Sequence, residues 1–104
     1  MTEPLDLLLP AALERWWKAS RSLLAARGVT ATLQGPFDAP GMDPVYILHM
    51  DSEHRETEVC LFQGGTVLFD GFDKHHAAKV DVGSAEVSSE HELVGLLARL
   101  AERV

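Results

Sequence analysis

The chain has 104 residues, which suffices for one domain and leaves no room for a second independent core. Hydrophobic residues make up 46% of it and charged residues 24%, which argues against a disordered chain and is typical of a soluble globular protein. The formal net charge of −7 repels phosphate backbones and anionic lipids, so nucleic-acid and membrane binding are not expected. The same charge favours association with a basic protein partner.

The sequence carries no sign of export. Cys60 is the only cysteine, so neither an intramolecular disulfide nor a cysteine-rich metal site is possible, as is usual in a reducing compartment. The apolar run at residues 5–9 is far too short to span a bilayer, is interrupted by Asp6 and has no basic segment before it. We therefore expect a cytoplasmic protein without a membrane anchor.

The first predicted element is an amphipathic helix over residues 11–27. Pro10 fits its first turn, where the missing N–H has no cost, and Gly28 suits a left-handed stop. Trp17 is expected to pack on the rest of the fold, with the adjacent Trp16 at the margin. The apolar residues that recur at helical spacing are Leu13, Trp16, Trp17, Leu23 and Leu24.

Strand-like segments with a period of two follow the helix. They cover residues 29–33, 45–50, 55–63 and 66–70, with a possible fifth strand at 78–82. The stretch 35–41 is rich in Gly and Pro and predicts a loop. Between the third and fourth strands, Gly64 and Gly65 supply the positive φ angles of a two-residue hairpin turn, so these strands should be antiparallel neighbours.

A second helix is predicted to begin after Ser89. Ser89 and Glu92 match the capping-box pattern, in which each side chain accepts from the other residue's backbone N–H. One stripe of the helix is apolar, and it comprises Leu93, Leu96, Leu97, Leu100 and Val104. The element order favours a single α+β domain over residues 1–104, a two-layer sandwich whose mainly antiparallel meander sheet carries both helices on one face.

The other face of such a sheet stays uncovered, and the third strand indicates which side chains it holds. Burying Glu56 and Glu58 unpaired would cost more than burying Cys60 and Phe62 would return, so the carboxylates should face outward. In the fourth strand Leu68 should share that side. Outward acidic and apolar residues together form a candidate partner-binding surface, whose members are Glu56, Glu58, Phe62, Leu68, Asp70, Phe72 and Asp73. The simpler alternative is an ordinary solvated sheet face.

No combination of residues matches a catalytic or metal-binding pattern. The adjacent His75 and His76 point to opposite sides of an extended segment, and His49 with His54 lack a third ligand at a recognisable spacing. Cys60 has no basic neighbour to activate it. We therefore expect no enzymatic activity, no metal site and no cofactor.

The element order, together with the segments "VYILHMDSEHRETEVCLFQGGTVLFDGFD" and, within it, "DSEHRETEVCLF", resembles the TriTu-type immunity proteins of bacterial polymorphic toxin systems. The resemblance covers residues 16–104. It implies a protein without enzymatic activity or cofactor that binds an ADP-ribosyltransferase toxin directed at elongation factor Tu and blocks its active site.

The leading hypothesis is thus a cytoplasmic immunity protein, monomeric when free, that recognises a basic surface of its cognate toxin. A secretion or effector chaperone, or another small protein-binding adaptor, is the alternative, and a chaperone of this size would usually dimerise. A metal-dependent or hydrolytic enzyme is the third possibility.

Overall fold

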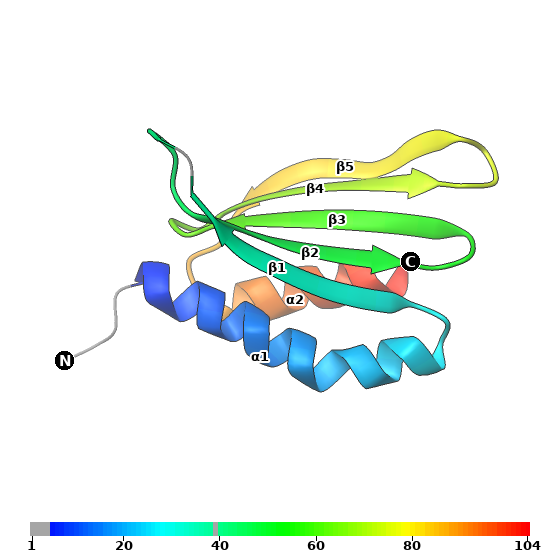
Figure 1. The fold of residues 1–104 in the computed structure, drawn as a ribbon, viewed down its shortest axis with the longest axis horizontal. Helices are drawn as coiled ribbons and strands as arrows, with labels where there is room; N and C mark the ends of the chain where they lie inside the picture. Colours follow the sequence, from blue (N-terminus) through cyan, green and yellow to red (C-terminus); the bar gives the residue numbers. More distant parts are fainter. Residues whose placement is uncertain (1–4, 39) are drawn as a thin grey trace.

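A computed structural model describes the backbone of residues 5–38 and 40–104, and the side chains from Leu8 onward within these ranges. It contains two helices and five strands in the predicted order (Figure 1). They are α1 (Leu5–Ala26), β1 (Thr30–Phe37), β2 (Val45–Asp51), β3 (Arg55–Phe62), β4 (Thr66–Asp73), β5 (Ala78–Glu86) and α2 (Glu90–Glu102). None of the described helices is long and apolar enough to cross a membrane.

The strands form one antiparallel sheet in the order β1-β2-β3-β4-β5, so each strand pairs with its neighbours in the sequence. Both helices lie against the same face of this sheet (Figure 1). The predicted α+β sandwich with an uncovered sheet face is therefore confirmed.

Helix α1 begins earlier than predicted, and Pro10 lies inside it rather than in its first turn. The added turn carries Leu9, which is fully buried one turn before the equally buried Leu13. Burial of a leucine side chain stabilises the fold by about 2 kcal/mol, which offsets much of the cost of the helical hydrogen bond that Pro10 cannot donate. Leu23, which the sequence placed with the apolar residues, is 71% exposed.

Tryptophan packing ties α1 to the sheet. Trp16 and Trp17 are both partly buried against the core. The indole Nε1 of Trp17 donates a hydrogen bond of 2.9 Å to the carbonyl oxygen of Ala31 on β1. This bond satisfies the polar atom of a large ring that otherwise contributes apolar area.

The β3–β4 connection differs from the predicted two-residue turn. Three residues, 63–65, join the strands, and the N–H of Gly65 donates to the carbonyl of Phe62 at 2.9 Å. Only Gly65 of the glycine pair has a positive φ, of 107°. A Cβ at Gly65 would lie 2.5 Å from the carbonyl oxygen of Val87, so the close approach of the chain before α2 also requires glycine.

Both edge strands are longer than predicted, and both contain an irregularity. Strand β1 continues past Leu33 to Phe37, with a register shift between Gln34 and Phe37. Strand β5 continues to Glu86, and its pairing with β4 shifts where Asp81 takes a positive φ of 52°. Register shifts of this kind bend an edge strand and interrupt its hydrogen-bonding row.

The start of α2 is capped as predicted on one side only. The Ser89 hydroxyl accepts from the N–H of Glu92 at 3.1 Å. The Glu92 carboxylate, however, accepts from the backbone N–H and the hydroxyl of Ser88, at 3.2 and 3.1 Å, and not from Ser89. Four leucines of the predicted stripe, Leu93, Leu96, Leu97 and Leu100, are buried in the core.

Candidate partner-binding face

We call the side of the sheet that faces away from the helices the open face. The alternation of side chains along β3 shows which residues lie on it. Thr57, Val59 and Leu61 are buried against the helices, with at most 4% exposure. Side chains alternate along a strand. The intervening Glu58 is therefore on the open face, where it is exposed, and Cys60 is half-buried beside it. The predicted orientation of β3 is thus observed.

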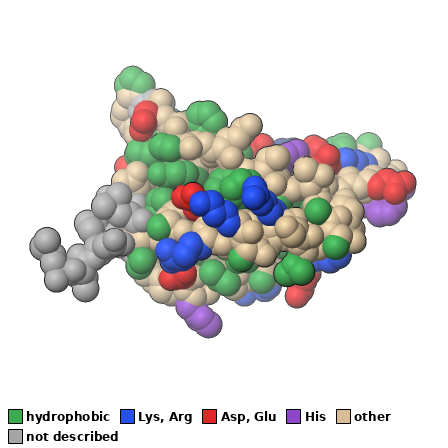
Figure 2. Space-filling model, turned by 60° about the horizontal axis from the view of Figure 1, so that its bottom comes forward, with side chains coloured by type: hydrophobic (Ala, Val, Ile, Leu, Met, Phe, Trp, Pro, Cys, Tyr) green, Lys and Arg blue, Asp and Glu red, His purple; other side chains and the backbone are tan. Residues whose placement is uncertain are grey.

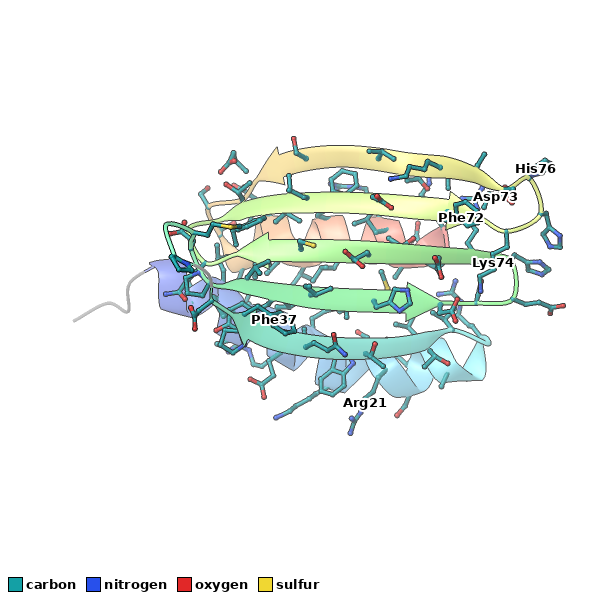
Figure 3. All side chains as sticks on the ribbon, turned by 45° about the horizontal axis from the view of Figure 1, so that its top comes forward. Arg21, Phe37, Phe72, Asp73, Lys74 and His76 are labelled. Carbon is teal, nitrogen blue, oxygen red and sulfur yellow. The ribbon has the colours of Figure 1, made fainter. Side chains whose placement is uncertain are left out.

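One end of the open face is apolar. The register places Phe37 of β1 beside Val45 of β2, and Val45 beside Phe62 of β3. The next cross-strand row contains Ile47, Cys60 and Leu68. Phe37 and Leu68 are 46% and 45% exposed, so this end presents apolar area to solvent across four strands (Figure 3).

The other end of the open face carries charge. Glu58 of β3 lies opposite His49 on one side and Asp70 on the other. The next row comprises Asp51, Glu56, Phe72 and Lys79. Lys79 Nζ lies 3.0 Å from Asp70 Oδ2, whereas Glu58 has no ion pair among the described residues. The predicted candidates Glu56, Glu58, Asp70 and Phe72 therefore lie together.

A shallow hollow lies where the apolar and charged ends meet. Its volume is about 350 Å³. Leu68 and Val82, the latter 61% exposed, contribute apolar walls, and Glu58 and Asp70 contribute carboxylates. Such a hollow suits a long side chain with an apolar stem and a positive head, because stem and head would each meet a matching wall.

The Cys60 thiol in this hollow is not activated. Its burial raises its pKa, and the charge of Glu58, a hydrogen bond from Sγ to Glu58 Oε1 at 3.7 Å and the charge of Asp70 raise it further, to about 11. Because the thiolate is the nucleophilic form, Cys60 is a poor nucleophile at neutral pH.

Asp73 does not belong to the open face, which corrects the sequence-based assignment. Strand β4 continues regularly to Asp73, so alternation places Phe72 outward and Asp73 on the helix side, opposite Arg55. Arg55 Nη2 lies 4.0 Å from Asp73 Oδ2, and its Nη1 lies 3.5 Å from Asp81 Oδ2 and 3.3 Å from the carbonyl oxygen of Arg103. Asp73 therefore takes part in a cluster that fastens the end of α2 to the sheet.

Hydrogen bonds lower the pKa of Asp73. The largest cause is the hydrogen bond from the His76 side chain, whose Nδ1 lies 3.0 Å from Asp73 Oδ2. The backbone N–H groups of His76 and His75 also donate to Asp73 Oδ1, at 3.1 and 3.0 Å. Asp73 thus organises the turn after β4 as well as contacting Arg55.

Sequence reasoning missed several members of the open face. Val45 and Ile47 alternate with the apolar Tyr46 and Leu48, so the first half of β2 does not distinguish its two sides. The second half does, because the polar His49 and Asp51 alternate with the buried Leu48 and Met50. Phe37 was placed in a loop, and Val82 at the end of a shorter fifth strand.

Charge is distributed unequally between the two sides of the molecule. The open face carries five carboxylates, of Asp51, Glu56, Glu58, Asp70 and Glu86. Two ammonium groups meet them: Lys79 pairs with Asp70, and Lys74 pairs with Asp51. Four of the nine Lys and Arg residues lie at positions 15, 18, 21 and 27, in or just after α1. Figure 2 shows basic side chains gathered over the helical side. On the open face, Glu56, Glu58 and Glu86 thus have no Lys or Arg partner among the described residues.

No three-residue metal site occurs in the described part of the chain, since no group of three or more His, Cys, Asp or Glu side chains there is arranged to hold an ion. Of the histidine pairs considered from the sequence, His75 and His76 diverge: His76 contacts Asp73, and His75 contacts His54. His49 lies 3.8 Å from Glu56 instead of approaching His54.

Comparison with known proteins gives no relative for this chain. No family model matches the sequence, and neither a curated protein nor a solved structure is similar to it.

Proposed function

We propose that this chain is an immunity-type inhibitor that binds a cognate antibacterial toxin domain through its open face and occludes the active site of that domain. The observation that carries the proposal is the uncovered sheet face, with its exposed apolar end beside an acidic end. Together they match the usual anatomy of a specific interface, where apolar anchors supply desolvation energy and charged groups set orientation.

The uneven charge supports a basic partner. The carboxylates of Glu56, Glu58 and Glu86, which have no Lys or Arg partner among the described residues, attract a positive surface and repel an acidic one. Inhibitors of enzymes that bind nucleic acids or nucleotides commonly meet positive active-site clefts, because those clefts recognise phosphate. An ADP-ribosyltransferase, whose substrate carries a pyrophosphate, belongs to this class and agrees with the resemblance to TriTu-type proteins.

The cytoplasm is the proposed location, and a free monomer is the proposed state. Register shifts on both edge strands support a monomer, because they hinder pairing of two sheets through their edges. A dimeric secretion chaperone would require a different surface for its own association.

The test is coexpression of the chain with the toxin domain encoded beside its gene, followed by growth and calorimetric binding measurements. Glu58→Lys should abolish protection and weaken binding, since it places a positive charge at the centre of the acidic end. Glu102→Lys is the matched control, because it makes the same charge reversal on the exposed side of α2.

A second matched pair tests the apolar end. Leu68→Ser should weaken binding by about 2 kcal/mol, or about thirtyfold in Kd, if Leu68 is an interface anchor. Leu23→Ser removes an even more exposed leucine from the helical side and should leave binding unchanged. If both leucine variants lose toxin affinity equally, or if neither loses any, the assignment of the binding site to the open face is contradicted.

A further inference from the structure

Two turns that are distant in the sequence lie side by side at one end of the sheet. They are the β2–β3 turn, residues 52–54, and the β4–β5 turn, residues 74–77. The backbone N–H of Lys74 donates to the carbonyl oxygen of His54 at 2.9 Å. Lys74 Nζ also donates to Asp51 Oδ1 at 2.6 Å and to the carbonyl oxygen of Ser52 at 2.7 Å, so Lys74 links the two turns (Figure 3).

Each turn presents one imidazole to the other. His54 Nδ1 and His75 Nε2 lie 2.5 Å apart, and the ring centroids are 4.7 Å apart with the planes inclined by 32°. Both side chains are exposed. The backbones that carry them are held by the turns themselves, because Ser52 Oγ accepts from the N–H of His54 and Asp73 Oδ1 accepts from that of His75.

Two imidazole nitrogens that converge on one point can share either a proton or a metal ion. Metal–nitrogen bonds are about 2.0–2.1 Å long, so two nitrogens on one ion stand about 3 Å apart. The observed separation is shorter than that value, so the two solvent-exposed rings must rotate apart to admit an ion between their nitrogens. Imidazole is a favoured ligand of copper, nickel and zinc, and copper(II) binds most strongly in this series.

We propose that His54 and His75 form a two-histidine chelate for a divalent transition-metal ion, with copper(II) preferred and water in the remaining coordination positions. Such a site has fewer protein ligands than a structural or catalytic zinc centre, so it is exchangeable. The ion would join the β2–β3 turn to the β4–β5 turn and add to the link that Lys74 already makes. The proposal is independent of toxin binding.

The test uses untagged full-length chain and CuCl₂ in a buffer that does not chelate metals. Calorimetry should show that the wild type binds one equivalent more than the double variant His54→Asn/His75→Asn. Each single variant should lower the affinity for that additional copper ion by about tenfold or more, because a single histidine lacks the second ligand held nearby. Copper(II) should also raise the thermal midpoint of the wild type but not that of the double variant.

His76→Asn and His91→Asn are the matched controls. His76 is in the same turn but contacts Asp73, and His91 is exposed on α2. Both variants should keep the additional equivalent. If the double variant binds copper(II) as the wild type does, or if His76→Asn weakens binding as much as His75→Asn, the chelate is refuted. Circular dichroism of each variant checks that the exposed turns remain folded.

Discussion

The thiol of Cys60 provides a direct test of the arrangement at the centre of the open face. Cys60 is the only cysteine, so the rate of reaction with Ellman's reagent reports on this site alone. Its pKa is raised from 9.0 to about 11 by burial, by the charge and hydrogen bond of Glu58, and by the charge of Asp70. The folded protein should therefore react slowly at pH 8.

The expected rate follows from the fraction of thiolate. At pH 8, a thiol with a pKa of about 9 is roughly 10% ionised, whereas one with a pKa of about 11 is roughly 0.1% ionised, a difference of about a hundredfold. The more basic thiolate is intrinsically more nucleophilic, which recovers about tenfold of this difference. Cys60 in the folded chain should thus react about tenfold more slowly than the same residue in the unfolded chain.

The perturbation is Glu58→Gln, which removes the charge of Glu58 and leaves an acceptor oxygen, the burial of Cys60 and the charge of Asp70 in place. The pKa of Cys60 should fall but stay above the value of an ordinary thiol, and the reaction at pH 8 should accelerate accordingly. Glu102→Gln changes a residue on α2, far from the hollow, and should leave the rate unchanged. A wild-type rate profile with its midpoint near pH 9, or no change in Glu58→Gln, would refute the proposed contact between these strand neighbours.

Three further predictions concern stability. Leu97→Ala should lower the free energy of unfolding by about 2–5 kcal/mol in urea titrations because Leu97 is fully buried, whereas Leu23→Ala should change it by less than about 0.5 kcal/mol. Ser89→Ala removes the acceptor at the start of α2 and should lower the thermal midpoint, by the equivalent of about 1 kcal/mol. Because the pKa of Asp73 is lowered on folding, its contribution to stability is present above its ordinary pKa of 3.8 and is lost as pH falls through the folded value. Urea midpoints of Asp73→Asn should consequently fall less steeply in acid than those of the wild type, and parallel curves would contradict the hydrogen bonds assigned to Asp73.

The orientation of β3 could be predicted because its acidic residues alternate with apolar ones, so only one orientation keeps Glu58 in water. The same method gives no answer in the first half of β2, where Tyr46 and Ile47 are neighbours on opposite faces and both are apolar. Which of these side chains face the helices is set by the register between β2 and β3, and that register depends on contacts between distant residues.

The start of α1 shows a second limit of local patterns. Proline is common in the first helical turn, so the sequence predicts that the helix begins at Pro10. The helix nevertheless extends to Leu5 because Leu9 fills the core, and that benefit depends on contacts with distant parts of the chain. The length of β4 had a similar effect on the candidate site, since the strand runs three residues past Asp70 and its regular alternation places Asp73 on the opposite side of the sheet.

The contact between His54 and His75 was likewise invisible to spacing arguments. These residues are 21 positions apart, and each belongs to a short polar turn that the sequence describes only as a turn. They meet because β2–β3 and β4–β5 are successive hairpins of one meander, which brings their turns to the same end of the sheet.

The register shifts in β1 and β5 bear on how the molecule behaves at high concentration. A straight, unpaired edge allows strands to be added one after another without limit, which is the route to fibres. Here the exposed apolar area lies on the flat of the sheet while both edges are bent. Association through side chains on a face stops once that face is covered. An exposed apolar face is therefore compatible with a protein that does not polymerise through its sheet edges.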